Sequence, residues 1–199
     1  MNQTLSLNKY RLLDISFFTI LMIAFEFLAV KGIRWFSEVY SVSLLLGISL
    51  IVMMRWGIWS IITIIAGTLT YCLANGASWE QYLIYLIGNL FLLFNLFWFY
   101  KKDQIGKGYI TVCFVLSGYG LIEIGRSFVS SILKENFLKV LIAFLGTDAI
   151  SVLITILIVL IARKQNGLFE DQITYLKRIQ AEENSSASLE VYDEKRENN

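Results

Sequence analysis

The octapeptide LIEIGRSF, residues 121–128, places Glu123 and Arg126 one helical turn apart inside the apolar stretch Gly108–Leu133. Ionised side chains in a membrane-spanning segment are costly, and they usually face the interior of the protein. A guanidinium group is a planar fork that matches a carboxylate or a phosphate. Arg126 is therefore a candidate ligand-binding group, with Glu123 holding it in orientation. The same spacing also allows an ion pair that only joins helices, and the sequence is compatible with both roles.

Other polar side chains interrupt the apolar runs at a similar depth. A helix rises about 1.5 Å per residue, so a cytoplasmic N-terminus would place Glu26, Asn75 and Asn89 in the outer half of the membrane and Asp148 near its middle. Four aromatic residues fall at the same outer level: Trp35, Trp79, Tyr82 and Tyr85. This arrangement predicts an outward-facing pocket for a small polar molecule. The predicted substrate-binding residues are Arg126, Glu123, Asn89, Asp148, Trp79, Tyr85 and Glu26.

Each of these residues also has a purely structural interpretation. Aromatic side chains at a membrane interface form ordinary belts, which suits Trp79 and Tyr82. The segment LGTDAIS gives Asp148 small polar neighbours for a helix-packing hydrogen bond. Glu26 lies close enough to the expected surface to extend its carboxylate toward water.

Several chemistries lack the residues they need. The chain has no histidine, and it carries no Walker A, H-E-x-x-H, G-x-S-x-G or C-x-x-C motif. We therefore expect no catalytic residues, no metal and no cofactor, although Asp148 and Glu123 leave an intramembrane enzyme as a minor alternative. The net charge of +1 does not favour nucleic acid as a partner. Cys72 and Cys113 both fall in apolar runs and are expected to be buried thiols.

The elements that must position these side chains are long apolar helices. The chain of 199 residues is 56% hydrophobic and only 17% charged, with a mean hydropathy of +0.62. A helical span needs about 20 apolar residues, and six runs come close to that length. We predict spans at Leu12–Val30, Tyr40–Met54, Ile58–Ala74, Tyr82–Tyr100, Gly108–Leu133 and Phe137–Ala162. The tight connection RWGIW predicts that the second and third spans form a helical hairpin.

Basic residues in the short connections predict the orientation. With the N-terminus inside, eight basic residues flank the cytoplasmic ends of the spans: Lys9, Arg11, Arg55, Lys101, Lys102, Lys107, Arg163 and Lys164. Four lie outside: Lys31, Arg34, Lys134 and Lys139. The sequence thus predicts an all-α, multi-pass protein of the cell membrane, with six transmembrane helices in residues 1–165 and both termini cytoplasmic. Residues 166–183 are expected to form a cytoplasmic amphipathic helix, and residues 184–199 a disordered tail.

Six spans in under 200 residues resemble the substrate-binding S components of energy-coupling factor (ECF) transporters. The segment SVSLLLGISLIVMMRWGIWSIITIIAGTLTYCL, residues 41–73, is similar to that family's second and third spans, where a short apolar span, a tight glycine-containing turn and a glycine-bearing helix follow one another. The resemblance implies high-affinity binding of a vitamin or other micronutrient. It also implies a transmembrane coupling subunit and two cytoplasmic ATPases as partners, with the lipid bilayer around the chain.

A non-catalytic membrane scaffold is the main alternative. Such a protein would resemble the rod-shape membrane proteins or would act as an accessory subunit of an exporter. The predicted cytoplasmic amphipathic helix suits this class as well as it suits an S component, and the sequence does not name a ligand.

Overall fold

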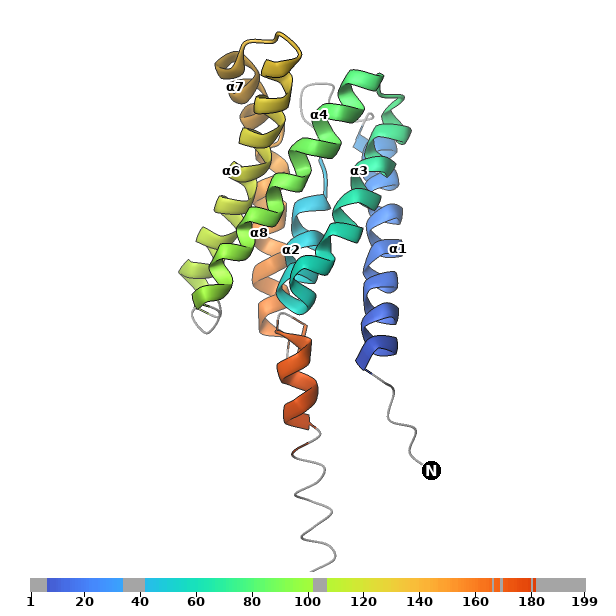
Figure 1. The fold of residues 1–199 in the computed structure, drawn as a ribbon, viewed down its shortest axis with the longest axis vertical. Coiled ribbons are helices and arrows are strands. Elements are labelled where there is room, and N and C mark those ends of the chain that lie inside the picture. The colour runs from blue at the N-terminus through green and yellow to red at the C-terminus, as the bar shows by residue number, and fades with distance from the viewer. Residues whose placement is uncertain are drawn as a thin grey trace, which may run out of the picture.

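The computed structural model describes residues 7–33, 42–101, 107–165, 167–168, 170–179 and 181. All regular structure in these residues is helical. The helices are α1 (Leu7–Ile33), α2 (Leu45–Trp56), η1 (Gly57–Ser60), α3 (Ile61–Asn75), α4 (Trp79–Leu90), η2 (Phe91–Lys101), α6 (Gly108–Ile132), α7 (Phe137–Thr147) and α8 (Ala149–Lys164) (Figure 1). One more helix covers residues 172–179. The predicted all-α fold is confirmed for this part of the chain, whereas Trp35 and the tail 184–199 lie outside it.

Four helical stretches are long and apolar enough to cross a membrane: Asn8–Lys31, Leu45–Asn75, Trp79–Phe99 and Gly108–Ile132. A fifth candidate arises if α7 and α8, which are bent by 52° at their junction, are counted as one span. These helices indicate a multi-pass membrane protein. The six crossings and the cytoplasmic termini stay predictions.

The stretch Leu45–Asn75 is interrupted at Gly57. Gly57 has φ 60° at the end of α2, in the left-handed region that glycine adopts without steric cost. Figure 1 shows α2 and α3 side by side, joined by the short turn that contains η1. The side chain of Leu45, at the start of α2, reaches within 3.3 Å of the Cβ position of Gly67 in α3, as expected for a chain that folds back. The hairpin predicted from RWGIW is therefore present.

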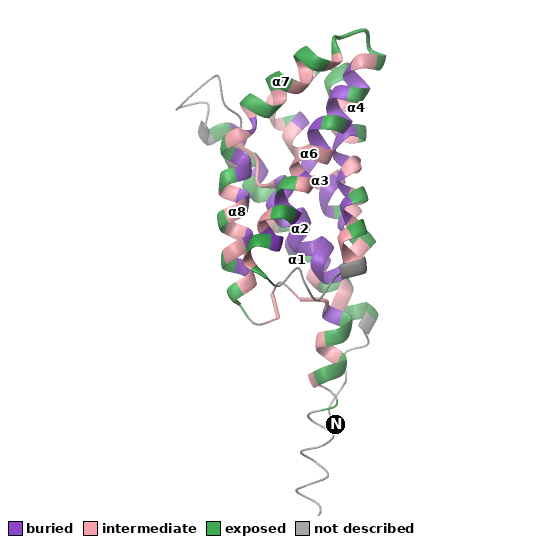
Figure 2. Ribbon diagram, turned by 90° about the vertical axis from the view of Figure 1, so that its left-hand side faces the viewer, coloured by how far each residue is buried: buried purple, intermediate pink, exposed green. Residues whose placement is uncertain are grey.

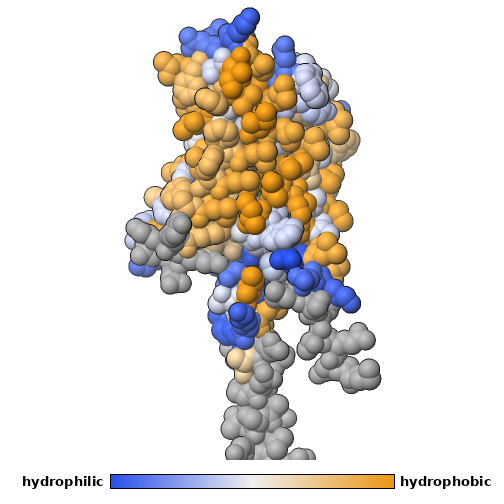
Figure 3. Space-filling view, in the orientation of Figure 1, coloured by the Kyte–Doolittle hydropathy of each residue, from blue (hydrophilic) through white to orange (hydrophobic). Residues whose placement is uncertain are grey.

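Helix α2 lies at the centre of the bundle. All twelve of its residues are buried (Figure 2), and it packs against α1, α3, α6 and α8. The outer surface is apolar instead: on the face seen in Figure 3, hydrophobic residues cover the middle of the body and hydrophilic residues lie toward its two ends. Large apolar side chains on α1, such as Leu12, Phe17 and Ile20, are more than half exposed. This inside-out pattern is the one that a lipid environment allows.

At the C-terminal end of α2, a buried ion pair joins the bundle to the C-terminal segment. Arg55 of α2 binds Asp14 of α1 through two bonds of 2.8 Å, and it donates from Nη1 to the carbonyl oxygens of Gly167 (2.6 Å) and Leu168 (3.2 Å). The indole Nε1 of Trp56 donates to the same carboxylate. These contacts fix the chain just before the helix 172–179, which extends away from the bundle along its long axis (Figure 1).

Candidate functional site

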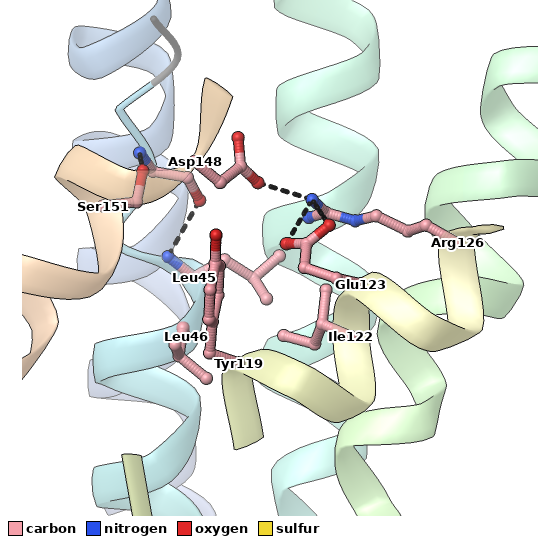
Figure 4. Close-up of a pocket in the computed structure, with 9 residues that line it drawn as sticks. Leu45, Leu46, Tyr119, Ile122, Glu123, Arg126, Asp148 and Ser151 are labelled. Carbon is pink, nitrogen blue, oxygen red and sulfur yellow. Dashed lines mark hydrogen bonds and ion pairs between the residues drawn. The ribbon is translucent and has the colours of Figure 1, made fainter. Parts of the chain in front are cut away.

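Four polar side chains predicted from the sequence meet in the interior of the bundle. The Nη1 atom of Arg126 lies 2.5 Å from Oδ2 of Asp148 and 3.2 Å from Oε1 of Glu123, and its Nε lies 2.8 Å from Oδ1 of Asn89. Each of the four residues is at most 9% exposed. Figure 4 shows Glu123 and Arg126 on α6 facing Asp148 across a cavity. We call these four residues the Arg126 cluster.

Two glycines bring α4 and α6 close enough for this cluster to form. A Cβ atom on Gly88 would lie 2.7 Å from the backbone nitrogen of Arg126, and one on Gly125 would lie 2.6 Å from the carbonyl oxygen of Gly88. Small residues allow two membrane helices to approach with their backbones in contact. Because Asn89 follows Gly88 and Arg126 follows Gly125, the glycine contact places the amide beside the guanidinium.

Aromatic rings cover the guanidinium of Arg126. Its Cζ lies 4.8 Å from the ring centroid of Tyr85 and 5.7 Å from that of Phe144. The ring of Tyr71 packs against Tyr85, with their centroids 5.1 Å apart. A cation over an aromatic face is stabilised by the ring quadrupole, and more so away from water. Tyr85 was predicted from its depth, whereas Tyr71 and Phe144 look like any other apolar-run residue in the sequence.

A non-helical segment and a bend between two helices meet beside the cluster. Residues 42–44 are not helical, and α2 begins only at Leu45, inside the body of the bundle (Figure 1). The bend of 52° lies between α7 and α8, where Asp148 stands. The two are bonded directly, because the backbone nitrogen of Ser43 donates to Oγ of Ser151 at 3.0 Å.

Glu26 of α1 accepts hydrogen bonds from the non-helical segment 42–44. Its Oε1 accepts hydrogen bonds from Oγ of Ser43 (2.8 Å) and from the backbone nitrogen of Leu44 (2.7 Å). Unsatisfied backbone groups cost several kcal/mol in a membrane interior (about 2–7 on transfer scales). The carboxylate of Glu26 therefore supplies the acceptor that an irregular start of α2 requires. Glu26 itself has no exposed surface.

Two small cavities flank Arg126 and Asp148. The volume open to the centre of a water molecule is ≈ 20 Å³ in one cavity and ≈ 10 Å³ in the other. Each cavity therefore has room for about one water. The larger is lined by Ser43, Leu45, Leu46, Tyr119, Ile122, Glu123, Arg126, Asp148 and Ser151 (Figure 4). The smaller is lined by Ser43, Leu45, Tyr71, Tyr85, Asn89, Arg126 and Asp148. In this conformation the cluster has room for a small polar group and not for a whole vitamin.

The structure thus gathers most of the predicted site. Glu123, Asn89 and Asp148 all bind Arg126, Tyr85 covers the guanidinium, and Glu26 accepts a hydrogen bond from Ser43 in the cavity wall. Trp79 is not brought to the cluster: it starts α4 and is 75% exposed, as a ring in an interfacial belt would be. The residues that sequence reasoning missed are Ser43, Tyr71, Tyr119 and Phe144. Of these only Ser43 carried a signal, as a serine directly before the apolar run LLL. Ser151, the last residue of LGTDAIS, was expected only as a helix-packing neighbour of Asp148.

The donor set of the described residues does not suit a metal ion. No group of three or more His, Cys, Asp or Glu side chains is arranged there to hold one. Cys72 and Cys113 are both free thiols. Cys72 is buried as predicted, but the prediction is wrong for Cys113, which is exposed on the side of α6 that faces away from the bundle.

Comparison with protein families, with curated proteins and with solved structures finds no match to this chain.

Proposed function

We propose that the chain is the membrane-embedded binding subunit of a transporter, and specifically an S component of the ECF type. The observation that carries the proposal is the meeting of the non-helical segment 42–44 and the α7–α8 bend at a buried charged cluster. Non-helical backbone at membrane depth is tolerated where it lines a cavity or is buried in protein, and transporters build their substrate sites from such discontinuous helices. Buried ionisable groups at this depth are functional by default. The segment 42–44 and the bend at Asp148 share one cavity with Arg126 and Glu123.

The proposed topology has six crossings with both termini in the cytoplasm. It is supported by the eight-to-four distribution of basic residues and by the reversal of the chain at Gly57, which allows α2 and α3 to be separate crossings. Counting α7 and α8 as one broken span completes the six. The ends of α1 and α8 that lead to the termini then lie on the same side of the bundle, as in Figure 1.

The proposal requires the site to open. Pockets for drug-sized ligands measure about 300–1,000 Å³, far more than the two water-sized cavities around Arg126 and Asp148. The α7–α8 bend and the irregular start of α2 are the elements whose displacement would enlarge the cavity without moving the long helices. The proposed cargo is a small polar micronutrient, and the proposed partners are a coupling subunit and two cytoplasmic ATPases.

A non-catalytic scaffold or exporter accessory subunit is the second candidate. The contact of Arg55 with the carbonyl groups of Gly167 and Leu168 favours it, because this contact holds the helix 172–179 out from the bundle, where a partner could bind. The small size of the cavities favours it as well.

Copurification from native membranes separates the two candidates. An affinity-tagged chain should bring down one membrane coupling subunit and two ATPases in fixed stoichiometry if it is an S component. Recovery of cell-shape or exporter proteins, with no ATPase pair, would support the scaffold and refute the transporter. A double variant, Ile173→Asp with Leu176→Asp, serves as a control for whether the partner docks on the C-terminal helix.

A further inference from the structure

Charge is unbalanced around the Arg126 cluster. Three carboxylates are buried there, on Glu26, Glu123 and Asp148, against one guanidinium. No other cation of the described residues reaches the cluster: Lys31 is exposed and donates to the carbonyl of Ala74, and Arg55 is bound to Asp14 at the other end of α2. The N-termini of α2 and α8 each offset about half a charge. Among the described residues, about one negative charge is thus left without a compensating cation in a region of low dielectric constant.

The guanidinium of Arg126 is already engaged by the protein. Its Nε and Nη1 atoms bind Asn89, Glu123 and Asp148, and the rings of Tyr85 and Phe144 lie over it. An anionic ligand would find only Nη2 of Arg126 not bonded to a described residue, and it would add charge of the wrong sign beside the carboxylates of Glu123 and Asp148. The cluster is thus not arranged as a receptor for a carboxylate or a phosphate.

One oxygen of the Glu26 carboxylate indicates that the described part of this region lacks a hydrogen-bond donor. Glu26 has no exposed surface, and its Oε2 has no hydrogen-bond partner among the described residues, although Oε1 accepts two hydrogen bonds. A buried polar atom without a partner is costly, and each case calls for an explanation. The partner of Oε1, Ser43, lines both cavities, so Glu26 lies one hydrogen bond behind the wall of the same site.

We propose that the site binds the ammonium group of an organic amine, the nitrogen sitting in the cavity between Ser43, Glu123, Asp148 and Ser151. This assignment rests on the proposed binding function and names its ligand class. An ammonium group is compact and carries only hydrogen-bond donors. The cavity of ≈ 20 Å³ matches it in size, and it offers carboxylate and hydroxyl acceptors. The adjoining smaller cavity has the rings of Tyr71 and Tyr85 in its wall, and such rings attract a cation.

The test uses the purified full-length chain in lipid nanodiscs with simple probes. Thermal unfolding is followed in up to 100 mM methylammonium chloride, with sodium chloride, sodium propionate and neutral propanol as matched additions. Methylammonium at about ten times its dissociation constant should raise the melting temperature by about 3 °C or more. Saturable retention of radiolabelled methylammonium gives a second measurement that does not depend on stability.

Matched variants locate the binding. Glu123→Gln and Asp148→Asn each remove one buried negative charge and should lower methylammonium affinity at least tenfold. Glu80→Gln removes the same charge from an exposed position in the first turn of α4 and should bind as the wild type does. If a charge variant fails to fold, the wild-type comparison of methylammonium with sodium still decides the matter.

The possible failures are distinguishable. Saturable binding of propionate with none of methylammonium would overturn the ammonium assignment and leave the binding function in place. Stabilisation by sodium equal to that by methylammonium would replace the amine by an inorganic cation, and it too would overturn the assignment. If no probe binds, and Glu123→Gln and Asp148→Asn raise the melting temperature unaided, the excess charge is met by protons and both the assignment and the proposed binding site are wrong.

Discussion

Substituting Gly125 by alanine tests how α4 and α6 place the Arg126 cluster. The added Cβ would lie 2.6 Å from the carbonyl oxygen of Gly88 and 2.6 Å from Cγ of Phe91. Non-bonded carbon atoms settle at about 3.5 Å, so the two helices must separate by roughly 0.9 Å. The same separation would lengthen the bond between Nε of Arg126 and Oδ1 of Asn89 from 2.8 Å to about 3.7 Å, beyond hydrogen-bonding range.

The energetic consequence follows from three effects. Overpacking costs about 1–3 kcal/mol, and loss of a buried hydrogen bond to a charged group costs about 1.5–3 kcal/mol. Alanine in place of glycine in a helix returns up to about 1 kcal/mol. The net loss is about 1.5–5 kcal/mol, and at about 2–4 °C per kcal/mol for a chain of this size the melting temperature should fall by at least about 3 °C.

The assay is thermal unfolding in nanodiscs, with Gly120→Ala as the matched control. Gly120 lies on the same helix, and its Cβ position has nothing within 4 Å. That variant should melt at the wild-type temperature or slightly above it. A Gly125→Ala protein that melts as high as Gly120→Ala would refute the reasoning. In an Asn89→Ala background the penalty of Gly125→Ala should shrink, because the hydrogen bond at issue is already absent.

Three further predictions test the topology, the guanidinium and the C-terminal helix. In a cysteine-free background, a cysteine at Ser78 should react with an impermeant thiol reagent added to intact cells, and one at Gln104 should not; the reverse labelling would invert the proposed orientation. Arg126→Lys should lower the melting temperature by several degrees, because a single lysine nitrogen replaces the Nε that binds Asn89 and the Nη1 that binds both carboxylates; an unchanged melting temperature would show that this geometry contributes nothing to folding. Ile173→Asp with Leu176→Asp should abolish partner copurification and leave probe binding in nanodiscs unchanged. Loss of probe binding would contradict the assignment of partner binding to the C-terminal helix and of ligand binding to the Arg126 cluster.

The parts of this fold that could be predicted are those carried by local sequence. The apolar stretch Gly108–Leu133 corresponds to α6 at Gly108–Ile132, and the turn at Gly57 follows from a glycine between two apolar runs. Glu123 and Arg126 were expected to pair because residues three apart share a helix face. Depth counting brought Asn89 to the same level as Arg126, although it did not predict the 2.8 Å contact between them.

The contacts that define the site depend on tertiary structure instead. The serine before the apolar run in SVSLLL signals a helix start nearby, but the sequence does not show that the carboxylate of Glu26, on another helix, binds the backbone there. Nothing in LGTDAIS marks a 52° bend, since neither proline nor a strong turn signal is present. Asp148 can end one helix and begin the next because Arg126 binds its carboxylate there. The irregular backbone at the start of α2 and at Asp148 is therefore stabilised by the buried charges. Removing these charges should restore regular helix and close the cavity. A Glu123→Gln, Arg126→Met, Asp148→Ala triple variant should consequently fold, because a buried ionic group can often be replaced as a unit, and it should bind none of the probes.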